Sequence, residues 1–200
     1  RLVVASSMNI YGEGLYRSVD GQNYIPSPRP MDQLKLGSWE PRDVRGAPLT
    51  PVPTPETKPP DLSSVYALTK WDQERLCLMM GQAYSIPTVA LRFFNVYGDR
   101  QALSNPYTGV LAIFASRLLN HHPPLIYEDG KQMRDFVSVH DVTQACRLAL
   151  SAADAPGRVF NVGSGRAITI REIARKVSAI LGREIPPVIA GQYRMGDIRH

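Results

Sequence analysis

The sequence has 200 residues, 44% of them hydrophobic and 20% charged, so the chain can bury a core of ordinary size. Its longest apolar runs, such as Val110–Ala115, are too short to cross a bilayer, which argues against a membrane protein. The net charge is +5, but the Lys and Arg residues are scattered, without the runs of a nucleic-acid groove, which favours an anionic small substrate over nucleic acid.

The first predicted element is the strand Leu2–Ala5, a short apolar run of the kind that is buried on both faces of a parallel sheet. Paired serines, Ser6 and Ser7, follow it. A fold that begins on a central strand is unusual, so we expect the sequence to be a piece of a longer chain.

Residues 13–62 hold most of the prolines and show neither a helical nor a strand period. This composition predicts an extended insertion rich in polyproline II conformation. It could be a tolerated surface loop. Because both of its ends lead to candidate catalytic residues, it could instead be a flap over the active site.

From residue 65 onward, predicted helices and strands alternate along the chain. Such alternation predicts an α/β fold with a doubly wound parallel sheet. The last helix opens with a capping box, in which Thr169 and Glu172 each accept from the other's backbone. The predicted helices span residues 65–84, 109–119, 141–151 and 170–181, and the predicted strands span 88–95, 125–127, 135–139 and 159–162.

Three segments carry candidate chemistry. Tyr66 and Lys70 lie four residues apart, which places a phenol and an ammonium on one helix face. This spacing is common by chance. It gains weight from two strands. One ends in Ser6 and Ser7, and the other, in the segment Leu91–Gly98, ends in polar and glycine residues; ligands of open α/β sheets bind at such carboxyl ends of strands.

These segments, in this order, resemble the extended short-chain dehydrogenase/reductase family, specifically its NAD-dependent nucleotide-sugar epimerases and dehydratases. The resemblance covers nearly the whole chain and continues through three later stretches, RDFVSVHD at 134–141, NVGSG at 161–165 and RMGD at 194–197. The resemblance implies a Rossmann-type doubly wound sheet with a small α/β substrate-binding lobe.

Carried over position by position, the family's catalytic roles fall on three residues. The resemblance implies that Ser7 hydrogen-bonds the sugar oxygen being oxidised and that Tyr66 is the acid and base. Lys70 would hold the nicotinamide ribose and stabilise the phenolate. Ser6 and Phe94 would complete the NAD site, with Phe94 lying along the nicotinamide.

The substrate implied by the resemblance is a nucleotide-diphosphate sugar. Asn95 and Arg134 match contacts to the diphosphate, and a guanidinium suits two phosphate oxygens. Arg194 and Asp197 match a pair near the nucleotide. Val110 ends a segment, 105–110, that would close over the substrate.

Two departures qualify the match. The proline-rich insertion is longer than in most relatives and, with the NPYTGV and YRMGDIRH segments, most resembles bacterial dTDP-L-rhamnose 4-epimerases. The Gly-x-x-Gly-x-x-Gly loop that cradles the pyrophosphate of NAD is missing from these 200 residues, as is the N-terminal dinucleotide-binding half that carries it. The 200 residues alone are therefore expected to be inactive.

The reaction implied is epimerisation at C4 through a transient 4-keto sugar. Dehydratases of the family carry an Asp-Glu pair after the catalytic residue, where this sequence has Met8 and Asn9. The alternatives are a UDP-glucose 4-epimerase, a nucleotide-sugar reductase, or an inactive fragment that retains only the nucleotide-sugar half-site.

The domain boundaries follow from the same resemblance. Residues 1–100 would be the C-terminal part of the NAD-binding domain, and residues 101–200 mostly the substrate lobe, interleaved with Rossmann elements around 134–165. The full-length protein would form a homodimer through the Tyr66 helix. Cys77 and Cys146 match no metal or redox spacing, so we expect no metal site and a reducing, cytoplasmic setting.

Overall fold

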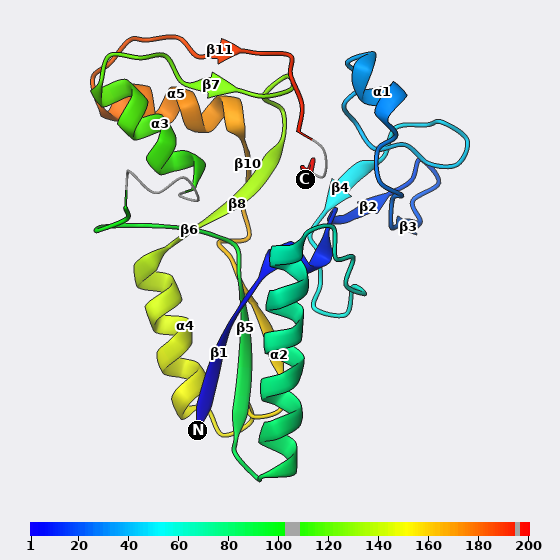
Figure 1. Ribbon diagram of the computed structural model, residues 1–200, viewed down its shortest axis with the longest axis vertical. Coiled ribbons are helices and arrows are strands. Elements are labelled where there is room, and N and C mark those ends of the chain that lie inside the picture. The colour runs from blue at the N-terminus through cyan, green and yellow to red at the C-terminus, as the bar shows by residue number, and fades with distance from the viewer. Residues whose placement is uncertain (103–108, 195–196) are drawn as a thin grey trace.

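The computed structural model describes residues 1–102, 109–194 and 197–200. Figure 1 shows three parts: a parallel sheet with its helices, a second α/β part around α3 and α5, and a small sheet that precedes α2 in the chain.

The parallel sheet has the strand order β1 (Leu2–Ser7), β5 (Thr88–Phe93), β9 (Val159–Val162). In the register, Ser7 lies opposite Phe93, and Phe93 lies opposite Val162, so all three strands end at the same edge. The helices α2 (Val65–Ala83) and α4 (Val139–Ser151) pack against β1 and β5, one on each side of them in Figure 1. This confirms the predicted α/β class, although β1 extends two residues further and includes both serines.

The core of this part forms on one face of β5, which carries Val89, Leu91 and Phe93. Val89 and Leu91 are almost fully buried and pack with residues of α4, β8 and β9. The next residue, Arg92, is a charged side chain that is only 5% exposed, and such a residue requires a partner.

The second part contains β6 (Asn95–Tyr97), β8 (Met133–Ser138) and β10 (Ala167–Thr169), in the sheet order β10-β8-β6. The helices α3 (Val110–Leu119) and α5 (Ile170–Ile180) pack together over a core of Phe114, Ile126, Ile173 and Ala174, beside the pair β7 (Leu125–Ile126) and β11 (Val188–Ile189). The predicted capping box is confirmed, since Thr169 accepts from the N–H of Glu172 and donates its own N–H to that carboxylate.

The proline-rich insertion contains more regular structure than its sequence pattern predicted. It forms an antiparallel sheet of β2 (Leu15–Arg17), β3 (Asn23–Tyr24) and β4 (Thr50–Val52), together with loops and the short helix α1 (Met31–Lys35). Strands of two or three residues are too short to show a period in the sequence. Tertiary burial stabilises them instead, because Tyr16 is fully buried and donates its hydroxyl hydrogen to Glu13.

Within these described ranges, no helix combines the length and the apolar character needed to cross a bilayer. The same residues include no group of three His, Cys, Asp or Glu side chains placed to hold a metal ion. Both cysteines are free thiols, and Cys146 packs against the core of the parallel sheet.

Candidate functional site

A cavity of about 250 Å³ opens where β1 and β5 end. It is lined by predicted site residues from four different segments: Ser7, Tyr66, Phe94, Asn95 and Val110. A larger hollow of about 820 Å³ between α5 and the loop that follows it contains none of the predicted site residues. The chemistry-bearing residues of the sequence motifs therefore converge on the smaller cavity.

Ser7 is positioned by the end of β1. Its hydroxyl accepts a hydrogen bond of 3.2 Å from the N–H of Asn9 and so caps the short 3-10 helix η1 (Met8–Tyr11). Ser6 points to the other face of the strand, where its hydroxyl donates to Glu74 at 2.6 Å. The structure thus brings the Ser7 side chain into the cavity, whereas the Ser6 side chain, predicted to bind NAD, lies in the protein interior.

Tyr66 and Lys70 are positioned by the first turns of α2. Ser64 caps this helix by accepting from the N–H of Ala67 at 3.1 Å, which sets where the helix begins. The Tyr66 ring lines the cavity and remains 51% exposed. The Lys70 ammonium donates to the carbonyl of Ala5 at 2.9 Å and to Gln73 at 3.1 Å. It therefore lies beside β1, two residues before Ser7.

Phe94 and Asn95 follow β5 directly. The N–H of Phe94 donates to the carbonyl of Val162 at 3.1 Å, and the Asn95 amide donates to the carbonyl of Asp135 at 3.2 Å. Asn95 also pairs in register with Phe136 of β8, another lining residue. Val110 lies in the first turn of α3 and lines the cavity. The remainder of the predicted closing segment, 105–108, lies outside the described residues.

Three other predicted residues lie outside the cavity, toward the C-terminal segment. Arg134 is on β8, two positions before the lining residue Phe136 and on the same face of the strand. Its guanidinium donates to the carbonyls of Ile198 and Arg199 at 2.5 and 3.0 Å, and burial lowers its pKa. In the structure, Arg134 therefore anchors the C-terminal segment.

Arg194 and Asp197 lie on that same C-terminal segment. The Arg194 guanidinium stacks over the ring of Tyr127, 4.3 Å from its centroid. Burial raises the pKa of the Asp197 carboxyl, and the nearby charges of Arg194 and Arg134 counter that rise. Neither Arg194 nor Asp197 lines the cavity. Their part of the molecule is called here the nucleotide end, after the role that the sequence resemblance predicts for them.

A buried ion pair behind the cavity was missed by the motif analysis. Arg92 of β5 donates to both carboxylate oxygens of Glu74 at 2.6 and 3.0 Å, and to the Tyr11 hydroxyl at 2.7 Å. Burial alone would lower the pKa of Arg92, but these partners raise it. Since Glu74 lies eight residues after Tyr66 on α2, the pair fixes this helix against the sheet. A charged residue inside the apolar run of β5 was the available signal.

The insertion holds η1 in place at the opposite side of the cavity. The buried Lys58 ammonium donates to the carbonyl of Tyr11 at 2.7 Å, and the N–H of Asp61 donates to the carbonyl of Ile10 at 2.8 Å. Gly12 ends η1 with φ +61°, and a Cβ there would lie 2.6 Å from the carbonyl oxygen of Asp61. Only glycine suits this position, because the backbone is left-handed and the neighbouring chain is close.

The chain is similar in sequence to known proteins. The sequence profile of the NAD dependent epimerase/dehydratase family matches residues 44–163. The chain is 38% identical, over all 200 residues, to a dTDP-L-rhamnose 4-epimerase of Burkholderia thailandensis and covers 53% of that protein.

Solved structures show the same likeness. A UDP-N-acetylglucosamine 4-epimerase from Methanobrevibacter ruminantium M1 superposes with a TM-score of 0.75 at 29% identity, covering 99% of this chain and 52% of its own. For a Thermus thermophilus UDP-glucose 4-epimerase in complex with NAD, the TM-score is 0.68 at 32% identity, with coverages of 99% and 53%. The chain spans about half the length of the relatives it matches, and it belongs to the NAD dependent epimerase/dehydratase family.

Proposed function

We propose that the enzyme containing this chain epimerises C4 of a nucleotide-diphosphate sugar, with a dTDP-L-rhamnose-like sugar as the first candidate. The observation that carries the proposal is the shared cavity of Ser7 and Tyr66, with the Lys70 ammonium held beside the same strand. The 38% identity to the Burkholderia thailandensis enzyme supports the choice of sugar.

The residues of the cavity fit the nicotinamide end of NAD. Lys70 has three donor hydrogens, and its two hydrogen bonds within the protein leave one for a ribose hydroxyl. The Phe94 ring lines the cavity and offers an apolar face to a nicotinamide. When bound, NAD supplies a hydride acceptor and then a hydride donor. In the proposed enzyme, the glycine-rich loop that binds its pyrophosphate lies in another segment of the protein.

The proton chemistry belongs to Tyr66 and Ser7. Tyr66 takes the proton of the C4 hydroxyl as the sugar is oxidised, while Ser7 donates a hydrogen bond to the same oxygen. The positive charge of Lys70 stabilises the phenolate form that this step requires. After the keto sugar turns in the cavity, Tyr66 returns the proton to the oxygen as hydride is delivered to the other face.

The cavity also argues against dehydration. Met8 and Asn9 both line it, and neither can protonate a departing hydroxyl group. Epimerisation needs no such acid, because no group leaves the sugar. The nucleotide diphosphate would be bound by Asn95, Arg134, Arg194 and Asp197, which keeps the substrate attached while its sugar rotates.

The experiment replaces Tyr66 with Phe in the full-length enzyme. We expect turnover of dTDP-L-rhamnose to fall by about 1000-fold, because the acid/base group is lost while the ring is kept. Tyr84→Phe is the matched control, since this tyrosine ends the same helix, is 67% exposed and should leave turnover unchanged. Turnover by Tyr66→Phe at the wild-type rate would contradict the proposal.

The same assay separates the alternatives. Turnover of UDP-glucose in place of dTDP-L-rhamnose would identify a UDP-glucose 4-epimerase, and net consumption of NADH would identify a reductase. For residues 1–200 alone, we expect no turnover of either nucleotide sugar, although they could still bind it.

We also propose that the full-length protein is a homodimer formed through α2. This helix exposes an unusual number of large apolar side chains, among them Leu68, Leu76, Met79 and Met80. Leu76→Lys should shift the sedimentation of the full-length protein from dimer to monomer. A dimer that persists in this variant would contradict the assignment of the interface to α2.

A further inference from the structure

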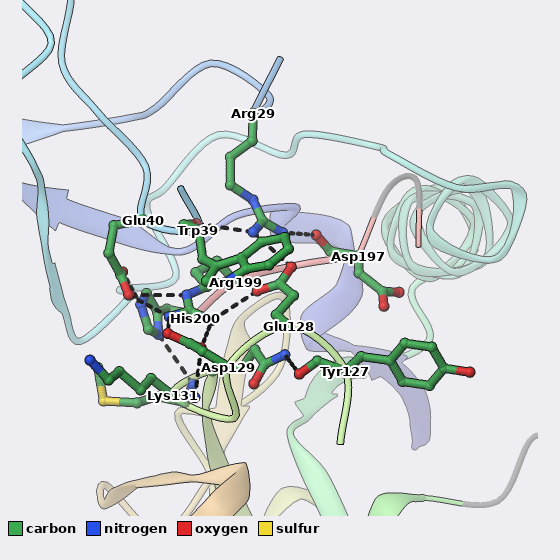
Figure 2. Close-up of polar contacts among 12 residues, drawn as sticks. Arg29, Trp39, Glu40, Tyr127, Glu128, Asp129, Lys131, Asp197, Arg199 and His200 are labelled. Atoms are coloured by element: carbon green, nitrogen blue, oxygen red, sulfur yellow. Dashed lines mark hydrogen bonds and ion pairs between the residues drawn. The ribbon is translucent and has the colours of Figure 1, made fainter. Parts of the chain in front are cut away.

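The insertion is joined to the nucleotide end by a buried cluster of charged residues, called here the Arg29–Arg199 cluster. Figure 2 shows that its members come from three separate segments: the insertion, the loop after β7 and the C-terminal segment. The members are Glu13, Arg29, Glu40, Glu128, Asp129, Arg199 and His200.

Arg29 joins all three segments through one guanidinium. Its side chain is 4% exposed and donates to the carboxylate of Glu128 at 2.8 Å and to the carbonyl of Trp39 at 3.0 Å. It also donates to the carbonyl of Asp197 at 2.8 Å, and its Nε lies 3.7 Å from the carboxylate of Glu13. An insertion residue therefore holds the backbone of a predicted nucleotide contact directly.

Arg199 provides a second connection. Its fully buried side chain donates to Glu128 and Asp129, each at 2.8 Å, and to Glu40 of the insertion. Its backbone N–H donates to the carboxylate of Glu13 at 2.8 Å, and its carbonyl accepts from Arg134 at 3.0 Å. The insertion thus also reaches Arg134 through the C-terminal segment.

This arrangement is unlike a surface loop and unlike a flap. A flap over the cavity would have to separate Arg29 and Arg199 from buried carboxylates each time it opened, which leaves charges uncompensated in the interior. In Figure 2, the Asp197 side chain points away from the cluster while its backbone carbonyl is bound by Arg29. The cluster therefore fixes the backbone and leaves the carboxylate available for a ligand.

We propose that the insertion is a positioning element for the nucleotide end of the site. Arg29 is its positioning residue: it holds the segment that carries Arg194 and Asp197 in the geometry that binds a nucleoside diphosphate. This inference rests on the proposed function, because it assumes that this segment binds the nucleotide. It assigns the insertion to ground-state binding and not to the hydride or proton steps.

The test compares Arg29→Lys with Arg45→Lys in the full-length enzyme. Lysine keeps the charge beside Glu13 and Glu128, but a single ammonium cannot reproduce the planar fork that reaches Trp39 and Asp197 together. Arg45 is the matched control, because it lies in the same insertion with its side chain 82% exposed. The measurements are the Kd of dTDP and of UDP by calorimetry, together with kcat and KM for the nucleotide sugar.

We expect Arg29→Lys to raise the Kd of the preferred nucleoside diphosphate about tenfold and KM in parallel, with kcat changed by less than about twofold. Arg45→Lys should match the wild type in all of these values. Wild-type Kd in a folded Arg29→Lys protein would overturn the inference, as would a loss confined to kcat.

If Arg29→Lys does not fold, Glu40→Gln provides the second variant, because its side chain is partly exposed and it bonds both Arg199 and His200. A rise in Kd of about threefold supports the inference, and an unchanged Kd overturns it. If the wild-type enzyme binds neither dTDP nor UDP, it is the proposed function that fails.

Discussion

At the cavity, the predicted site residues lie at the ends of β1 and β5 and in the first turns of α2 and α3. At the nucleotide end, ion pairs join segments that are far apart in the sequence, such as Arg199 and Glu40, which are 159 positions apart. The first arrangement follows from the parallel register, which brings Ser7 and Phe93 to one edge. The second depends on charge pairs that no local pattern specifies.

The two ends of the site should therefore respond differently to substitution. Changes at the cavity should alter the rate or the stability of the parallel sheet while the affinity for nucleotide is kept. Changes at the Arg29–Arg199 cluster should alter affinity or local stability while the rate at saturation is kept.

The largest expected effect comes from Arg92→Met in the full-length enzyme. Removing the guanidinium leaves the Glu74 carboxylate, 1% exposed, without its charge partner, and this should lower the free energy of unfolding by about 3–5 kcal/mol. Urea unfolding followed by circular dichroism measures it. The double variant Arg92→Met with Glu74→Leu should recover much of the loss, and a single variant as stable as the wild type would show that the pair does not hold α2.

Ser7→Ala should produce the next largest effect. It removes the hydroxyl that hydrogen-bonds the reacting oxygen in the proposed mechanism, so kcat should fall by about 100-fold while the Kd of the nucleoside diphosphate stays unchanged. Steady-state kinetics and calorimetry measure the two values. Ser63→Ala, an exposed serine just before α2, is the control. Equal losses in kcat and in nucleotide affinity would contradict the prediction that the two ends of the site respond differently to substitution.

The smallest expected effect is the pH dependence that Glu40 confers. Burial would raise the pKa of this carboxyl, but hydrogen bonds from His200 and Arg199 lower it to about 2. Because the folded pKa lies below the unfolded value, the stabilisation is present above about pH 4.5 and is lost as the pH falls toward 2.

Glu40→Gln should therefore lower the free energy of unfolding by about 1 kcal/mol at pH 7, after allowance for the partial exposure of the side chain. The difference between wild type and variant should shrink in urea titrations repeated at pH 4 and pH 3. Glu184→Gln, an exposed carboxylate, should show no such difference. A difference in the free energy of unfolding that stays constant with pH would show that the effect comes from packing and not from the charge of Glu40.

The sequence was sufficient to predict the parts of this molecule that have a local signature. The helix of Tyr66 and Lys70, the strand before Ser7 and the capping box of Thr169 each follow from residues within a few positions of one another. The start of the Tyr66 helix and the end of the Ser7 strand meet at one cavity, as expected from the rule that ligand sites of open α/β sheets lie at the carboxyl ends of strands.

The parts that were missed depend on contacts between distant segments. The insertion shows no period because its strands are two or three residues long, and the buried ring of Tyr16 packs against His200 of the C-terminal segment. The partner of the Ser6 hydroxyl is likewise distant in sequence, because Glu74 is 68 positions away and is itself bound by Arg92. Spacing along one sequence carries no information about such pairs.

Tyr66, Lys70 and Glu74 form one stripe along α2, at intervals of four residues. A rotation of this helix by one residue, about 100°, would take the phenol out of the cavity and the carboxylate away from its guanidinium at the same time. The buried pair of Glu74 and Arg92 therefore sets the rotation of the helix from its interior side, and the direction of Tyr66 toward the cavity depends on that rotation.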